Sequence, residues 1–433
     1  MKNHRISITP AKYLRGEIIL PGDKSITHRA IIFSSIAEGK SHLKGVQRGR
    51  DCLATLKCMG EMGVPIREEG KQIIIEGVGL EGLSEPEDVL NCENSGTTMR
   101  LLAGLLAGQS FYSVLSGDEY LRRRPMRRIV KPLREMGAKI EGREKGKFPP
   151  LTIVGRELKG INYLSPLASA QVKSCLLLAA LYAKGKTSVR ESYKSRDHTE
   201  RMMQYLGIPV EVRGLEVQIE GKNKRNFKGK SFYIPGDISA GAFFMGAAVS
   251  LPGSRIKLSN VGLNPTRRGF LDVLISMGAE IKISNLEKVC GEEVGDVEIR
   301  GGNNLRGVVV QGEMIPRLID EIPIITVVSC FAQGKTLIKD AAELRVKETD
   351  RIKATVSELR KMGADIEERE DGMLIRGGKK LKGALVKSWA DHRIAMALTI
   401  AGLCCKGETT IVDTQCIDTS FPDFQKTLNE VVS

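Results

Sequence analysis

The chain of 433 residues repeats one pattern six times, and this repeat constrains its fold more than any other feature. In each copy, a run of small and apolar residues passes through a glycine-containing turn into a stretch with the composition of a β-strand. The turn glycines, which are 69, 77, 68, 81 and 73 residues apart, are Gly39, Gly108, Gly185, Gly253, Gly334 and Gly407. A unit of this size buries its apolar face best against copies of itself, so we expect the copies to pack together.

A second helix is predicted in the first five copies, and it ends at Met-Gly or Leu-Gly. These pairs are Met62-Gly63, Met136-Gly137, Leu206-Gly207, Met277-Gly278 and Met362-Gly363. Glycine directly after a helix is the usual left-handed stop. Pro125 suits the first turn of the second of these helices. Each copy therefore predicts helix–strand–helix–strand, and six copies can form one ring, a solenoid or two domains of three units.

Composition narrows the class of partner. Lys and Arg number 66 against 52 Asp and Glu, a net charge of +14 that attracts nucleic acid, membrane phosphate or a small acidic substrate. Aromatic residues make up 5%, few for a surface that stacks bases. The most apolar run, Cys175–Ala183, is shorter than the roughly 20 residues of a membrane helix. Nine cysteines without metal or disulfide spacing predict a cytoplasmic protein with no metal site.

Polar clusters stand where the apolar helices are predicted to begin. The segment PGDKSITHRA (21–30) places Lys24 and Ser25 near a helix start, with Arg29 about one turn further on. Backbone N–H groups at such a start favour phosphate or carboxylate. The competing interpretation is ordinary capping by Asp23 or Ser25.

The second helix start carries the same design. NSGTTMR (94–100) contains Gly96, which lets a ligand approach the backbone closely, although Asn94 and Thr97 can also act as ordinary caps. In the arginine run that follows, Arg124 is the candidate ligand, since the next residue is proline and an Arg fork binds carboxylate or phosphate in bidentate fashion. The alternative for this run is a solvated or polyanion-binding face.

Four further segments carry candidate residues. SPLASAQVKS (165–174) offers Ser169 and Gln171 to a polyol, and ADHRIAMA (390–397) places Arg393 at a helix start. LIDEIPII (318–325) sets Asp320 within an apolar stretch, where it is a candidate general base or part of a surface turn. ELRVKETDRI (343–352) alternates acidic and basic residues, which suit either a substrate or mutual salt bridges.

Together these segments resemble one family, the 5-enolpyruvylshikimate-3-phosphate synthases. The resemblance runs from residue 21 to residue 424 and rests on PGDKSITHR, NSGTTMR, RRRPM, SAQVKS, SRDHTERM, GFLDVLISMGA, IDEIP, LRVKETDR, DHRIAMA and TSFPDF. It implies an α/β fold of two hinged domains, each of three βαβαββ units with inner helices surrounded by sheets, an inside-out α/β barrel. The implied domains are 21–236 and 1–20 plus 237–433, with the hinge near 20–22 and 235–237. Such domains close when ligands bind.

The resemblance also implies the reaction and its residues. The carboxyvinyl group of phosphoenolpyruvate passes to the 5-hydroxyl of shikimate 3-phosphate through a tetrahedral intermediate that loses phosphate, without metal or organic cofactor. The catalytic residues would be Asp320, Glu348 and Lys24. Phosphoenolpyruvate would bind Lys24, Gly96, Arg124, Gln171, Arg351 and Arg393. Shikimate 3-phosphate would bind Lys24, Ser25, Arg29, Ser169, Gln171, Ser195, Asp320 and Lys347.

Two departures from the family pattern concern single contacts. Thr419-Ser420-Phe421 stands where some members carry a lysine, and Ala170 follows Ser169 where some carry a second serine, so that contact would come from the Ala170 backbone. Gly96 is the position at which alanine is associated with glyphosate tolerance, so we expect a glyphosate-sensitive enzyme. We also expect a cytoplasmic monomer that binds neither nucleic acid nor membrane.

Two alternatives belong to different classes. The sibling transferase acting on UDP-N-acetylglucosamine has the same fold but uses a cysteine in the loop that here reads GDEYLRRRPM, and no cysteine lies between Cys92 and Cys175. A basic nucleic-acid-binding repeat protein would explain the net charge, but not the polar clusters at six helix starts.

Overall fold

The computed structural model describes residues 4–221, 226–302 and 304–433, and the chain divides into two compact units. The amino-terminal unit comprises Gly22–Ile234 and Lys288–Glu292. The carboxy-terminal unit comprises the residues up to Pro21, Pro235–Glu287 and Glu293–Ser433. The chain thus passes from one unit to the other at the two Pro-Gly turns, while the assignment of Lys288–Glu292 had no signal in the sequence.

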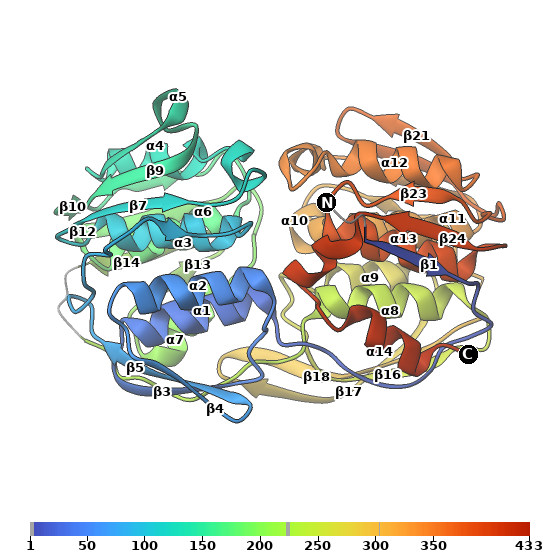
Figure 1. The fold of residues 1–433 in the computed structure, drawn as a ribbon, viewed down its shortest axis with the longest axis horizontal. Coiled ribbons are helices and arrows are strands. Elements are labelled where there is room, and N and C mark those ends of the chain that lie inside the picture. Colours follow the sequence, from blue (N-terminus) through green and yellow to red (C-terminus); the bar gives the residue numbers. More distant parts are fainter. Residues whose placement is uncertain (1–3, 222–225, 303) are drawn as a thin grey trace. The chain divides into compact units, whose positions relative to one another are not determined.

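The amino-terminal unit contains three pairs of helices, each pair with its own sheet (Figure 1). Its helices are α1 (Lys24–Ser35), α2 (Arg50–Glu61), α3 (Gly96–Ala107), α4 (Arg127–Glu135), the short α5 (Arg143–Gly146), α6 (Ala170–Ala180) and α7 (His198–Leu206), with a 3-10 turn, η1 (Leu121–Arg123). Its strands are β3 (Glu38–Lys44), β4 (Ile66–Glu69), β5 (Gln72–Val78), β6 (Leu90–Asn91), β7 (Tyr112–Ser116), β8 (Lys139–Gly142), β9 (Phe148–Val154), β10 (Leu158–Lys159), β11 (Asn162–Leu164), β12 (Ala183–Arg190), β13 (Glu211–Arg213), β14 (Glu216–Gly221) and β15 (Phe232–Tyr233).

The carboxy-terminal unit repeats this plan. Its helices are α8 (Ile238–Ser250), α9 (Gly269–Ser276), α10 (Met314–Leu318), α11 (Ile322–Phe331), α12 (Arg351–Lys361), α13 (His392–Cys404) and α14 (Phe424–Val431), with 3-10 turns η2 (Ile319–Glu321), η3 (Ala342–Val346) and η4 (Thr414–Thr419). Its strands are β1 (Arg5–Ile8), β2 (Arg15–Ile19), β16 (Arg255–Gly262), β17 (Glu280–Val289), β18 (Glu292–Arg300), β19 (Val309–Val310), β20 (Lys335–Ile338), β21 (Asp365–Arg369), β22 (Gly372–Arg376), β23 (Leu385–Lys387) and β24 (Thr409–Val412).

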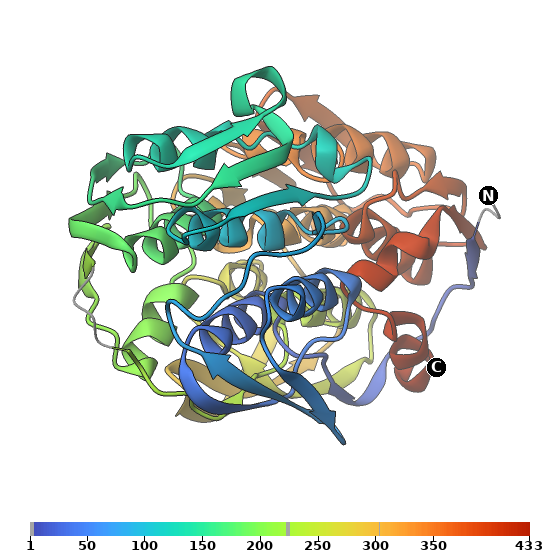
Figure 2. The same cartoon turned by 60° about the vertical axis from the view of Figure 1, so that its left-hand side comes forward.

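Among the described residues, four of the six sheets share one strand order, while the sheet around β12 also contains β11 and the β1-β24-β23 sheet has three strands. The strand that follows an inner helix pairs in parallel with a short edge strand and antiparallel with a longer one, as in β6-β7-β9-β8 and β19-β20-β22-β21. In both views of the amino-terminal unit, α1 and α2 lie on one face of the β15-β3-β5-β4 sheet (Figures 1 and 2). The repeat seen in the sequence is therefore the βαβαββ unit of an inside-out α/β fold.

Strands from distant parts of the chain complete the first, fourth and sixth repeats. β15 pairs in parallel with β3, and β2 pairs in parallel with β16. β1 pairs antiparallel with β24, at the place that a hairpin strand takes in the other repeats. The two strands predicted near the N-terminus thus pair within the carboxy-terminal unit.

The inner helices are buried on nearly all sides, and each unit has its own hydrophobic core. In α8 every residue from Ile238 to Val249 is buried, which explains why its sequence carries no charged residue and is almost entirely apolar. Helices α3 and α6 approach so closely that a Cβ on Gly104 would lie 2.1 Å from the carbonyl oxygen of Cys175. Among the described residues, no helix combines the length and apolar character that crossing a membrane requires.

The predicted helix stops are confirmed, with one difference among the turn glycines. All five glycines of the Met-Gly and Leu-Gly pairs have positive φ, between 80° and 98°. Among the six turn glycines, Gly108 has a φ of −96°. A Cβ there would lie 2.4 Å from the Cβ of Tyr182, so this position requires glycine for space rather than for a left-handed backbone.

Candidate active site

The three inner helices of the amino-terminal unit begin with side-chain caps. Asp23 accepts a hydrogen bond from the Ile26 amide at 2.9 Å, and Ser169 caps α6. In α3 the cap is Ser95, which accepts from the Thr98 amide at 3.1 Å. The expectation that Asn94 or Thr97 caps this helix was wrong, because Ser95 precedes the first helical residue and its hydroxyl reaches the amide three positions on.

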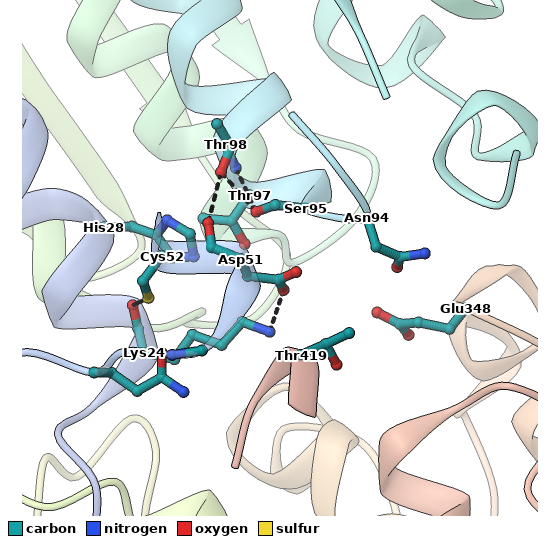
Figure 3. A network of polar contacts seen from close by, with 12 residues as sticks. Lys24, His28, Asp51, Cys52, Asn94, Ser95, Thr97, Thr98, Glu348 and Thr419 are labelled. Atoms are coloured by element: carbon teal, nitrogen blue, oxygen red, sulfur yellow. Dashed lines mark hydrogen bonds and ion pairs between the residues drawn. The ribbon is translucent and has the colours of Figure 1, made fainter. Parts of the chain in front are cut away.

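Lys24 and Asp51 form an ion pair between the starts of α1 and α2 (Figure 3). A chain of hydrogen bonds supports this corner, because Thr98 donates to the Asp51 carbonyl oxygen and bonds Thr55, which in turn bonds His28. Burial, together with the charges of Lys24 and Arg29, holds the pKa of His28 well below its ordinary value, so this imidazole is neutral. No pattern in the sequence pointed to Asp51, which lies in an ordinary amphipathic helix.

Arg29 is buried one turn into α1 and ties three elements together. Its Nη1 donates to the Ser25 carbonyl oxygen at 2.8 Å, Nε to Thr199 at 2.6 Å and Nη2 to Ser174 at 2.7 Å. Arg29 therefore fixes the backbone of Ser25 as well as adding positive charge near the start of the helix.

Gly96, Arg100, Arg124 and Gln171 form one cluster. A Cβ on Gly96 would lie 2.8 Å from Nη1 of Arg100 and 2.9 Å from Nη1 of Arg124. Arg100 donates to the amide oxygen of Gln171 at 2.5 Å, and the amide nitrogen of Gln171 donates to Thr97 at 2.9 Å. Arg100 was not among the residues predicted from the sequence, although it ends the NSGTTMR segment and lies four residues, one helical turn, after Gly96.

The arginine run divides by burial. Arg124 is buried and donates to the backbone and side-chain oxygens of Asn94, both at 3.2 Å, whereas Arg122 and Arg123 are exposed. The helix α4 begins only at Arg127, so the expectation that Pro125 lies in its first turn was wrong. Arg124 has an extended backbone, which residues before proline prefer.

Ser169 and Ser195 meet through a buried glutamate. The Ser169 amide donates to one oxygen of Glu191 at 3.1 Å, and the Ser195 amide donates to the other at 3.3 Å. Ala170 is the first residue of α6, so its N–H belongs to the set that has no partner within the helix.

In the carboxy-terminal unit, Arg351 gathers three carboxylates. Its Nη1 lies 3.0 Å from Asp320, Nη2 lies 2.7 Å from Glu348 and Nε lies 2.8 Å from Asp391. The Arg351 side chain is 2% exposed. Burial lowers the pKa of Arg351, but the charges of Asp391, Glu348 and Asp320 raise it above its ordinary value, so the guanidinium stays charged.

Lys347 and Arg393 are the other two predicted site residues of this unit. The Nζ of Lys347 is 3.7 Å from Asp320. Arg393, in the first turn of α13, donates to the Ser239 carbonyl oxygen at 3.1 Å and lies 3.8 Å from Glu321. Thr419, the position of the missing lysine, donates to the Cys416 carbonyl oxygen at 2.7 Å.

A strained turn precedes Asp391, the carboxylate that caps α13 and holds Arg351. Trp389 and Ala390 have φ values of 56° and 55°, a conformation that costs a residue with a Cβ about 1 kcal/mol or more. The indole of Trp389 donates to Glu358 at 2.9 Å, which locks this turn. The strain is therefore held by packing next to the site.

Replacing Ala390 by glycine will stabilise the chain by about 0.5–1 kcal/mol, because glycine adopts positive φ without the Cβ penalty. Chemical denaturation measures this change. Ala384→Gly, at a position of the same unit whose φ is not positive, is the control and will destabilise by about the same amount. Equal losses for the two variants would show that the turn is unstrained.

The predicted site residues thus fall into two sets, one in each unit. The amino-terminal set is Lys24, Ser25, Arg29, Gly96, Arg124, Ser169, Gln171 and Ser195, and the carboxy-terminal set is Asp320, Lys347, Glu348, Arg351 and Arg393. The first set offers helix starts and cations to anionic groups, and the second offers carboxylates for proton transfer. No group of three His, Cys, Asp or Glu side chains suited to a metal occurs among the described residues.

Known proteins of one family match this chain over nearly its full length. The family model described as EPSP synthase (3-phosphoshikimate 1-carboxyvinyltransferase) matches residues 8–428. The 3-phosphoshikimate 1-carboxyvinyltransferase of Geobacter metallireducens is 52% identical over 427 residues, 99% of each chain. That of Alkaliphilus metalliredigens is 51% identical over 419 residues, 97% of this chain and 98% of the relative.

A solved structure gives the same result for the fold. EPSP synthase from Acinetobacter baumannii superposes with a TM-score of 0.88 at 43% identity, covering 99% of this chain and 98% of that one. The family model and the full-length relatives at about 50% identity all indicate the same family. The chain belongs to the EPSP synthase family, the 3-phosphoshikimate 1-carboxyvinyltransferases, and is a transferase of the shikimate pathway.

Proposed function

We propose that this chain transfers the enolpyruvyl group of phosphoenolpyruvate to the 5-hydroxyl of shikimate 3-phosphate and releases phosphate. The observation that supports this most directly is the full-length match to the family, joined to a buried arginine that holds two candidate acid–base residues. Phosphoenolpyruvate binds Lys24, Gly96, Arg124, Gln171, Arg351 and Arg393. Shikimate 3-phosphate binds Lys24, Ser25, Arg29, Ser169, Gln171, Ser195, Asp320 and Lys347.

The reaction requires one proton to leave an oxygen and another to reach a carbon. Asp320 takes the proton of the 5-hydroxyl, and the oxygen then attacks the carbon that bears the phosphate. Glu348 and Lys24 deliver a proton to the methylene carbon, and the tetrahedral adduct collapses with loss of phosphate and of a methyl proton. Arg351 holds Asp320 and Glu348 in fixed orientation, so little reorganisation is needed during proton transfer.

The test is phosphate release from phosphoenolpyruvate with shikimate 3-phosphate, run beside an assay with UDP-N-acetylglucosamine. Release with shikimate 3-phosphate alone supports the proposal. Release with the sugar nucleotide alone would assign the sibling reaction. Salt-sensitive retention on DNA without any turnover would favour the nucleic-acid-binding alternative.

Gly96 provides a sharper test of the phosphoenolpyruvate site. Gly96→Ala will raise the KM for phosphoenolpyruvate and will raise the inhibition constant of glyphosate more, because the new Cβ would stand under 3 Å from both Arg100 and Arg124. Steady-state kinetics with competitive inhibition measures both, and the unsubstituted chain should be inhibited near its phosphoenolpyruvate KM. As a control, Gly60→Ala adds a Cβ with nothing within 4 Å at a residue whose φ is not positive, and it should leave both constants unchanged.

We also propose that the chain works as a cytoplasmic monomer whose domains are 21–236 and 1–20 plus 237–433, hinged near 20–22 and 235–237. The contact-based units, which change over after Pro21 and Ile234, support the boundaries. The burial of seven of the nine cysteines as core residues supports a reducing compartment. Small-angle scattering with and without both substrates tests the single-chain mass and domain closure.

A further inference from the structure

A cluster of three buried charges lies behind the start of α6. Lys173 on α6 pairs with Glu191, which follows β12, and with Glu200 on α7, both at 2.8 Å. The side chains are 2%, 2% and 3% exposed. Burial lowers the pKa of Lys173, but the charges of Glu200 and Glu191 raise it above its ordinary value, so the lysine is charged. Buried charges of this kind add little net stability, which calls for another reason for their presence.

The two glutamates differ in what else they hold. Glu191 accepts the amide of Ser169 at 3.1 Å through Oε1 and the amide of Ser195 at 3.3 Å through Oε2. These two segments are 26 residues apart in the chain (195 minus 169). Glu200 binds the same lysine, but none of the hydrogen bonds found among the described residues joins it to either serine. Glu191 therefore acts as a bridge between two serine-bearing segments.

Both serines carry hydroxyls suited to one anion. The hydroxyl of Ser169 caps α6 by accepting the Val172 amide at 3.5 Å. This contact is long, so another acceptor can take its place at small cost. Ser195 is 3% exposed, and its Oγ is buried without a hydrogen-bond partner in the structure. A buried hydroxyl without a hydrogen bond destabilises the fold unless a ligand supplies that bond.

We propose that Glu191 is a positioning residue for the phosphate of shikimate 3-phosphate. Its carboxylate fixes the backbones of Ser169 and Ser195 so that both hydroxyls face one phosphate, without touching the substrate itself. Lys173, which is shared between Glu191 and Glu200, weakens the repulsion between the charge of Glu191 and the phosphate. The inference rests on the proposed function, because it takes shikimate 3-phosphate as the ligand of these serines.

The test compares Glu191→Gln with Glu200→Gln. Glutamine keeps the shape of Glu191 but replaces one acceptor by a donor, so one of the two serine amides loses its partner. Glu191→Gln should raise the KM for shikimate 3-phosphate about tenfold and leave the KM for phosphoenolpyruvate within about twofold. Glu200→Gln removes charge from the same lysine and should leave both KM values within about twofold.

A double-mutant cycle with Ser195→Ala measures the coupling between the two residues in shikimate 3-phosphate binding. A general loss of stability does not produce such a coupling. If Glu191 acts by aiming the Ser195 hydroxyl, the effects of the two changes on shikimate 3-phosphate binding will not add. Thermal midpoints and calorimetric binding of shikimate 3-phosphate accompany the kinetics, and Glu191→Asp replaces Glu191→Gln if the latter does not fold.

Three results would overturn the proposal: equal increases in both KM values, an equal effect of Glu200→Gln, or additive effects in the cycle. Failure of the proposed function is distinguishable, because the unsubstituted chain would then neither release phosphate nor bind shikimate 3-phosphate in the calorimeter.

Discussion

Replacing Asp320 by asparagine will lower kcat for enolpyruvyl transfer by at least about 100-fold, because an amide of the same shape cannot accept the 5-hydroxyl proton. Asp320 lies 3.0 Å from Arg351 and 3.7 Å from Lys347, so two cations hold the carboxylate in place. Initial rates of phosphate release at saturating substrates measure the loss. Because asparagine keeps one oxygen acceptor, the KM for shikimate 3-phosphate should change far less than kcat.

The matched control is Asp365→Asn. Asp365 also lies close to two cations, Lys379 and Arg376, but these contacts are on the surface of β21. Its loss should leave kcat within about twofold, as expected for a surface substitution away from the site. If the Asp320 variant kept its kcat, Asp320 would not be the general base, whatever the change in KM.

Replacing Arg351 by lysine will lower the free energy of unfolding by about 3–5 kcal/mol and abolish measurable turnover. A single ammonium cannot reproduce the planar fork that reaches Asp320, Glu348 and Asp391 at 2.7–3.0 Å, so the fully buried Asp391 loses its counter-charge and the half-buried Asp320 and Glu348 each lose a charged hydrogen bond. Denaturant unfolding measures the first effect, and phosphate release by the folded fraction measures the second.

Arg376 offers a control of the same chemistry at the surface. It lies 3.3 Å from Asp365 and 3.0 Å from Glu367, but its side chain is 41% exposed. Water screens such pairs, so Arg376→Lys should cost no more than about 1 kcal/mol. If the Arg351 variant were as mild as this control, the three carboxylates would not depend on the guanidinium, and the proposed orientation of Asp320 and Glu348 would fail.

Local patterns were enough to predict the helix stops and the strands near the N-terminus. The stop glycines were predictable because a left-handed residue after a helix is a local requirement that glycine meets at low cost. The error at Pro125 arose because two positions suit proline, the first helical turn and the extended segment before a helix, and only packing selects between them. The cap of α3 was missed for a similar reason, since Asn94, Ser95 and Thr97 all have capping side chains.

The sixfold helix–strand–helix–strand repeat, the apolar inner helices and the family can be read from the sequence, because these depend on the periodicity of side chains and on motifs of a few adjacent residues. Which partners meet depends on the three-dimensional fold. Asp51, Arg100, Glu191 and Asp391 reach Lys24, Gln171, the two serines and Arg351 from other elements. Their spacing in the chain carries no signal, because the folding of the chain, rather than neighbouring residues, brings each charged side chain to its partner.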